Sequence, residues 1–133
     1  MLSFSNLSLI SEDFNEESAT TTGNFELQIA SENLRIVSNN ISSFFIEGTV
    51  TNLNVNFASG IGRFEGGTLI AQNVQVFHRG TNKMIVHPIQ SLKGELRSTG
   101  DLISKNKPTT IEVQEFYNLC KKSFQYLLLQ IFL

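Results

Sequence analysis

Two histidines and two glutamates are the residues of this 133-residue chain that come nearest to forming a chemical site. His78 and His87 have side chains that bind metals, but no cysteine or acidic residue stands close to them in sequence to complete a set of ligands. We therefore expect both to be surface or turn histidines. The sequence predicts no metal and no cofactor.

Glu65 and Glu95 are the only acidic residues in the span from residue 48 to residue 100. Acid–base cleavage of a glycan needs two carboxylates that face each other across the substrate. By family comparison, polysaccharide lyases built as β-helices gather several acids to hold calcium. Because this span has so few acids, we expect no catalytic residue and no enzymatic activity.

Two other patterns have structural explanations. Arg97 and Asp101 flank a turn, and we expect them to pair across it, which is a common structural device. Gly60 and Gly62, like the pair at 66–67, follow predicted strands and lead into further strands. A phosphate-binding glycine loop leads into a helix instead, so these glycines do not predict a nucleotide site.

Positions that favour turns recur at an interval of 20 residues, at Asn40, Gly60, Gly80 and Gly100. Glycine and asparagine tolerate a positive φ, so this spacing indicates a chain that turns the same kind of corner repeatedly. Self-similarity of this length is typical of a solenoid, in which each repeat is one coil stacked on the last. We predict structural turns at these four residues.

The segments between the marks alternate apolar and polar residues, the period of a strand with one buried face. A small polar residue precedes each alternating segment, at spacings of 19, 21 and 18 residues. This unequal spacing predicts a β-bulge between coils. The leading pairs are Asn33-Leu34, Asn52-Leu53, Asn73-Val74 and Ser91-Leu92.

The repeats predict an all-β solenoid of about four short parallel coils, with two columns of core residues. One column contains Leu34, Leu53 and Val74, and the other contains Phe44 or Phe45, Phe64, and Met84 or Ile85. Since Phe44 and Phe45 are adjacent in a strand, one of them must point outward. A leucine-rich repeat also fits residues 34–41, but the following coils lack its Asn and Leu, so we reject it.

The ends of the chain differ from its middle. Leu7 and Leu9 alternate like another strand, so residues 1–22 are a lead-in or a partial coil. Residues 110–116 alternate in the same way and should close the stack. Residues 118–133 form an apolar tail, in which Leu127, Leu128 and Ile131 share one face of an expected short helix. The tail is shorter than the roughly 20 apolar residues of a membrane span.

Charge and cysteine content exclude some classes of partner. The net charge is −2 and the basic residues are dispersed, so we expect no binding to nucleic acid. No Lys or Arg precedes Arg35, so the N-terminus lacks the charged region of a secretory signal, and we expect a truncated chain. Cys120 is the only cysteine, which rules out an internal disulfide.

Five short motifs resemble the head GIN domain, a family of auto-transporter adhesin heads found in envelope-associated proteins of Bacteroidetes. The resemblance covers about Gly23 to Tyr117, and the block from His78 to Asn82 is its most specific part. The motifs are Leu53-Asn-Val-Asn-Phe57, Gly62-Arg-Phe-Glu-Gly66, Leu69-Ile-Ala-Gln-Asn73, His78-Arg-Gly-Thr-Asn82 and Arg97-Ser-Thr-Gly-Asp101.

The resemblance implies a right-handed β-helix-like solenoid over residues 23–117, located in the cell envelope or outside the cell, with no established activity. We expect a non-enzymatic surface module that acts as an adhesin or interaction domain. Its partner would be an envelope protein, a glycan or another copy of itself. The alternative is a carbohydrate-active β-helix that binds or cleaves a glycan, which the scarcity of acids and the absence of Trp disfavour.

Overall fold

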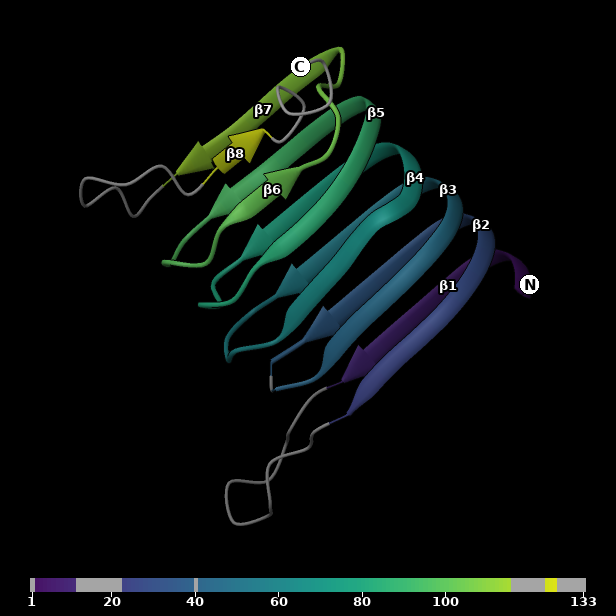
Figure 1. The fold of residues 1–133 in the computed structure, drawn as a ribbon, viewed down its shortest axis with the longest axis horizontal. Helices are drawn as coiled ribbons and strands as arrows, with labels where there is room; N and C mark the ends of the chain where they lie inside the picture. Colours follow the sequence, from purple (N-terminus) through teal and green to yellow (C-terminus); the bar gives the residue numbers. More distant parts are fainter. Residues whose placement is uncertain (1, 12–22, 40, 116–123, 127–133) are drawn as a thin grey trace.

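The computed structural model describes residues 2–11, 23–39, 41–115 and 124–126, and these residues form one parallel sheet wound into a solenoid (Figure 1). No helix occurs among them. The strands follow the order of the chain along the stack, except that β7 pairs with β5 beside β6. They are β1 (Leu2–Ser11), β2 (Asn24–Ser38), β3 (Ser43–Phe57), β4 (Arg63–His78), β5 (Met84–Leu96), β6 (Leu102–Ser104), β7 (Thr110–Glu115) and β8 (Phe124–Tyr126).

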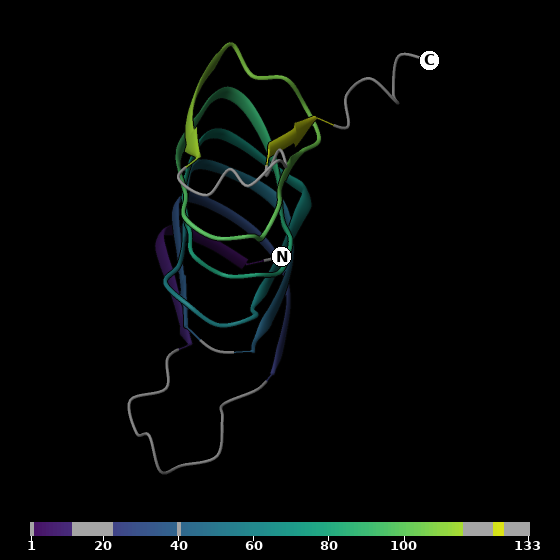
Figure 2. The same ribbon diagram turned by 90° about the vertical axis from the view of Figure 1, so that its left-hand side faces the viewer.

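Each long strand bends in its middle and so forms most of a coil by itself. In β3 the part before the bend (residues 43–50) and the part after it (residues 52–57) pair separately with β2 and β4. We call these parts the first limb and the second limb. The two limbs face each other across the core, and short turns connect one coil to the next (Figures 1 and 2). In the next coil after β5, the limbs are separate strands, β6 and β7.

Both predicted core columns are confirmed. Leu34 is aligned with Leu53, and Leu53 with Val74, in the second limbs. In the first limbs Phe44, Phe64 and Met84 are aligned in the same way. All six side chains are buried. The strands β2 to β5 supply the four predicted coils, and β6 with β7 adds a fifth turn.

Aromatic contacts within the first limbs and across to the second limb strengthen the core. The rings of Phe25 and Phe44 lie parallel with centroids 4.8 Å apart, and Phe57 contacts Phe44 at 5.9 Å. Phe44 and Phe57 are fully buried, and burying such a side chain stabilises a protein by about 1.5–3 kcal/mol. Phe45 points outward and is half-buried, as the adjacency of the two phenylalanines predicted.

The predicted bulge is also confirmed. The register between β3 and β4 shifts between Phe45 and Gly48, where β4 has one more residue than β3. The register between β4 and β5 shifts in the same part of the first limb. The pair Gly66–Gly67 lies in the irregular stretch of β4. A Cβ atom at Gly66 would lie 2.6 Å from the Phe64 ring, so this position requires glycine.

Gly48 and Gly94, which the sequence did not mark, have the most restrictive glycine environments in the coils. Their φ angles are 123° and 151°, which side chains of L-residues rarely adopt. A Cβ atom would lie 1.9 Å from the carbonyl oxygen of Ile29 at Gly48, and 2.0 Å from that of Val76 at Gly94. Each glycine therefore lets two successive coils approach closely.

The predicted turn glycines lie between the long strands, but only Gly60 has the expected positive φ, with a value of 88°. The expectation of such a backbone is wrong for Gly80 and Gly100, whose φ angles lie outside that region. Close packing explains Gly100 instead: its amide donates to the Gly80 carbonyl at 3.1 Å, and a Cβ would lie 2.4 Å from the His78 Nε2 atom. Asn40 lies outside the described residues.

The ends of the stack agree in part with the sequence. The partial N-terminal coil is confirmed, because β1 pairs with β2 and aligns Leu7 with Leu34. The strand predicted over residues 110–116 is confirmed as β7 over Thr110–Glu115. The expected helix is wrong for Phe124–Tyr126, which is β8 and pairs with β6. Leu127, Leu128, Ile131 and Cys120 lie outside the described residues.

Candidate functional site

His78 belongs to the core, so the expectation of a surface or turn histidine is wrong for it. It is 1% exposed at the end of β4, aligned with Phe57 in the preceding coil and with Leu96 in the following one. Its Nε2 atom lies 2.8 Å from the Asn82 carbonyl oxygen and donates a hydrogen bond to it, because a carbonyl oxygen can only accept. The Nδ1 atom has no hydrogen-bond partner in the described structure. Burial lowers the pKa of His78, against the opposing effects of the Asn82 carbonyl and Asp101.

His87 is half-buried in the first limb of β5, and its Nδ1 atom lies 3.1 Å from the Gly67 carbonyl oxygen. Both histidines thus contact backbone carbonyls of the solenoid. Among the described residues, no three His, Cys, Asp or Glu side chains lie close enough together to hold a metal ion.

The two candidate acids lie on opposite limbs. Glu65 is in the first limb of β4, where it forms an ion pair with Arg63. Glu95 is in the second limb of β5, and its Oε2 atom lies 3.0 Å from Nη2 of Arg97. Each carboxylate therefore faces a guanidinium two residues away on its own outer face. The pairing of Arg97 with Asp101 across the turn stays a prediction.

A row of four asparagines and one serine follows the bend of the coils, and we call it the corner ladder. Its members are aligned by strand pairing, and each side chain bonds to that of the preceding coil. Asn33 donates to Asn6 at 2.9 Å, Asn52 to Asn33 at 2.9 Å, Asn73 to Asn52 at 3.2 Å and Ser91 to Asn73 at 2.9 Å. These are the small polar residues that the sequence placed ahead of each alternating segment. They lie at a bend inside one strand rather than before a strand.

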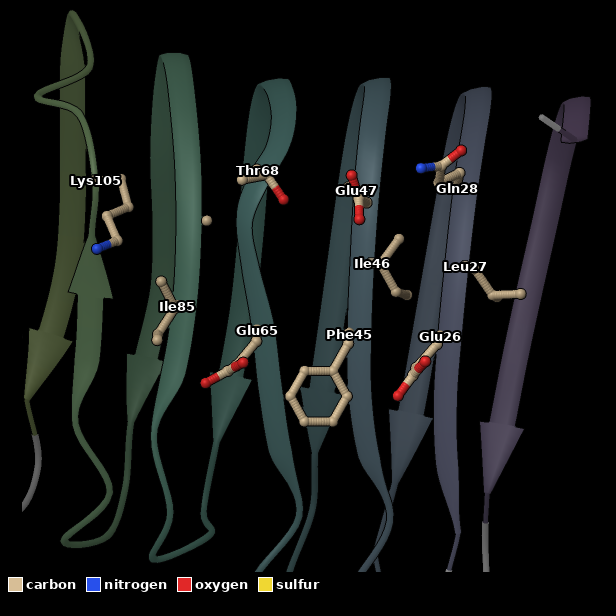
Figure 3. A pocket seen from close by; sticks show the side chains of 11 residues that line it. Glu26, Leu27, Gln28, Phe45, Ile46, Glu47, Glu65, Thr68, Ile85 and Lys105 are labelled. Atoms are coloured by element: carbon tan, nitrogen blue, oxygen red, sulfur yellow. The ribbon is translucent and has the colours of Figure 1, made fainter.

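A second row lies on the outer face of the first limbs, where the side chains surround an open hollow of about 650 Å³ (Figure 3). We call it the Phe45 hollow. The Phe45 ring lies between the carboxylates of Glu26 and Glu65, and Glu47 lies further along β3, level with Gln28. Glu26, Phe45 and Glu65 are aligned on β2, β3 and β4. Gln28, Thr68 and Lys105 complete the polar lining.

The polar side chains of the Phe45 hollow differ from those of the corner ladder in their partners. Within the described part of the chain, Glu65 has Arg63 as its partner, whereas the carboxylates of Glu26 and Glu47 form no ion pair or hydrogen bond. Both are exposed. The hollow therefore presents an aromatic ring and two free carboxylates on the rigid surface of a sheet.

Sequence reasoning found parts of both rows without their roles. It identified an outward phenylalanine and the recurring asparagines, but not Glu26 or Glu47 as neighbours of Phe45. Glu26 precedes Phe45 by 19 residues and Glu65 follows it by 20, the length of one coil in each direction. Outward residues at the coil interval were the signal that could have revealed the hollow.

A parallel sheet of bent strands, with polar rows on its outer faces, defines the class of the protein as a β-solenoid domain. Residues 3–108 match the family described as "Putative auto-transporter adhesin, head GIN domain". The match covers more than half of the chain, so the protein belongs to this family. The family description indicates an adhesin-like domain at the cell surface or envelope. Comparison with curated proteins found no match, and comparison with solved structures found none either.

The described residues form no helix that is long and apolar enough to cross a bilayer.

Proposed function

We propose that this protein is a non-enzymatic surface-interaction domain that binds its partner through the Phe45 hollow. One observation carries the proposal: a partly exposed aromatic ring stands between the carboxylates of Glu26 and Glu65, and Glu26 and the nearby Glu47 have no partner in the described structure. Because Glu26 and Glu47 form no ion pair or hydrogen bond in the described structure, their carboxylates are available for a ligand.

The chemistry of the hollow favours a positively charged group. The face of a phenylalanine ring attracts cations, and carboxylates add both charge and hydrogen-bond acceptors. Lys105 and Arg63 limit the net negative charge, so the site suits one or two ammonium groups rather than a highly basic segment. The ligand class is therefore a surface polymer that presents protonated amines.

Binding rather than catalysis is also supported by the placement of the acids. Glu65 and Glu95 lie on different limbs and cannot flank one substrate in the way that paired catalytic carboxylates do. We expect no glycosidase or lyase activity from the purified protein, with or without calcium. Activity that is lost in Glu65→Gln or Asp101→Asn would overturn the non-enzymatic assignment.

The proposal is tested by titrating the protein with two probes of the same backbone, a glucosamine tetramer with protonated amines and its uncharged N-acetylated form. Isothermal titration calorimetry should detect binding of the amine form and at least about 10-fold weaker binding of the acetylated form. Phe45→Ala and Glu47→Gln should each weaken binding of the amine form, because they remove the ring and one carboxylate.

Arg35→Gln is the matched control, since Arg35 is exposed on the second limb of β2, away from the hollow. It should leave the affinity unchanged. Equal affinity for both probes, or equal loss in Arg35→Gln and Glu47→Gln, would contradict the proposal.

A further inference from the structure

Among the described residues, the strand β1 forms one end of the sheet, and its outer edge is covered by no other strand. It pairs only with β2 among the described strands, so the backbone groups on its other side face away from the stack. Natural proteins guard such edges with charges, prolines or short strands. β1 is ten residues long and contains no charged residue, no proline and no glycine.

The opposite end of the second limbs is different. There β7 is six residues long and contains Glu112 and Glu115. Glu112 lies 3.8 Å from the Nζ atom of Lys93. The solenoid therefore has one short edge with charges and one long edge without any.

The corner ladder also ends at β1 with an unused donor. Asn33, Asn52 and Asn73 each donate their side-chain amide to the asparagine oxygen of the preceding coil, and Asn6 is the first member of the row. The Oδ1 atom of Asn6 accepts from Asn33, but in the described structure its Nδ2 group has no acceptor. The Nδ2 group of Asn6 can therefore donate to a side chain of another strand that pairs with β1.

Apolar side chains accompany this edge. Phe4 is 39% exposed and Ile10 is 55% exposed, while Leu7 and Leu9 are only half-buried at the open end of the core. An edge that combines unpaired backbone groups with exposed apolar side chains is a template for another strand.

We propose that β1 pairs with β1 of a second copy of this chain, antiparallel about a two-fold axis at Asn6. A two-fold axis places identical residues opposite each other, so each Asn6 Nδ2 group donates to the second lone pair of the other Oδ1 atom. Asn6 lies near the middle of β1, which lets both halves of the strand pair. The edge is uncharged on both copies, so no like charges oppose each other.

Head-to-tail stacking of β1 on β7 is the competing arrangement. It would continue the corner ladder from Thr110, which is aligned with Ser91, onto Asn6 of the next copy. That contact is heterologous and generates an open-ended filament, which always leaves one unprotected β1 edge at its end. The two-fold pair covers both β1 edges and closes.

The test is sedimentation equilibrium of the full chain over a range of concentrations, comparing wild type with Asn6→Asp. An aspartate still accepts the hydrogen bond from Asn33, so the ladder within each copy remains. In the dimer, however, two carboxylates would face each other, and like charges opposed at an interface are strongly unfavourable. We expect a wild-type dimer and a dissociation constant raised about 10-fold or more in Asn6→Asp.

Asn52→Asp is the control, because it adds the same charge to the ladder two coils away from the edge. It should leave the dimer intact, and circular dichroism should show the same strand content in all three proteins. A second edge variant, Ser8→Lys, should also dissociate the dimer. A monomeric wild type, a concentration-dependent filament, or equal dissociation in Asn6→Asp and Asn52→Asp would each overturn the two-fold pair.

Discussion

The corner ladder and the Phe45 hollow are two rows of polar side chains on the same coils, and they use those side chains in opposite ways. In the ladder each amide bonds to the amide of the neighbouring coil, at 2.9–3.2 Å. In the hollow Glu26 is aligned with Phe45 and Glu47 with Gln28, and neither carboxylate has a partner in the described structure. Strand pairing sets the spacing of both rows.

The difference shows how a repetitive fold separates structure from recognition. Identical amides at one position of each coil satisfy one another, so the row stabilises the stack and has few free groups. Carboxylates beside an aromatic ring cannot satisfy one another, because like charges repel. A row of mixed residues therefore retains groups that a ligand can bind, whereas a row of identical amides does not.

The largest change expected is in the backbone beneath the Phe45 hollow, at Gly48→Ala. The new Cβ atom would lie 1.9 Å from the Ile29 carbonyl oxygen, and a φ of 123° is itself unfavourable for alanine. We expect the free energy of unfolding to fall by about 3 kcal/mol or more, measured by urea denaturation.

Gly23→Ala is the control for Gly48→Ala, since no atom lies within 4 Å of its Cβ position. It should be neutral or slightly stabilising. A mild effect of Gly48→Ala would show that the coils can separate at β3, and that the frame shared by the two rows is not rigid.

Substitutions with a moderate effect on stability should distinguish the corner ladder from the Phe45 hollow. Asn52→Ala removes one donor and one acceptor from the middle of the corner ladder and should reduce stability by about 1 kcal/mol. Glu47→Ala removes an unpaired surface carboxylate and should change stability by less than about 0.5 kcal/mol. Thermal unfolding followed by circular dichroism compares them. A larger loss from Glu47→Ala would reverse the roles that we assign to the rows.

The smallest expected effect is a change of the free energy of unfolding with pH, and it involves neither the corner ladder nor the Phe45 hollow. Because burial lowers the pKa of His78, the unfolded chain binds a proton more readily than the folded protein below pH 6.5. The free energy of unfolding should therefore be highest above pH 6.5 and fall as the pH decreases toward the lowered pKa. His78→Leu should remove this part of the pH dependence. The free energy of unfolding is measured by denaturation at several pH values. If it depended on pH in His78→Leu as it does in the wild type, the assignment to His78 would be contradicted.

Alternation and spacing in the sequence were enough to predict the parallel solenoid and its core columns. Leu34, Leu53 and Val74 are aligned because a period of two fixes which side chains face inward, and the coil length fixes which ones meet. The family membership agrees with the motifs that suggested it. These features depend on local pattern, which a single sequence contains.

The environment of individual side chains was harder to predict because it depends on neighbouring coils. His78 is buried since it takes the place that Phe57 occupies one coil earlier. Gly48 requires glycine because of a carbonyl oxygen that is 19 residues away in sequence. The Phe45 hollow combines residues from several successive coils, from β2 to Lys105 after β6, and each of them looks like an ordinary surface position by itself.

Mapping of a bound amine by NMR tests the contrast between the two rows most directly. Backbone amide shifts of the labelled full chain would be followed during titration with the glucosamine tetramer. We predict that the perturbed amides cluster in the first limbs around Glu26, Phe45 and Glu65, with little change along the corner ladder. Shifts concentrated at Asn33, Asn52 and Asn73, with the amides around Phe45 unchanged, would contradict this account.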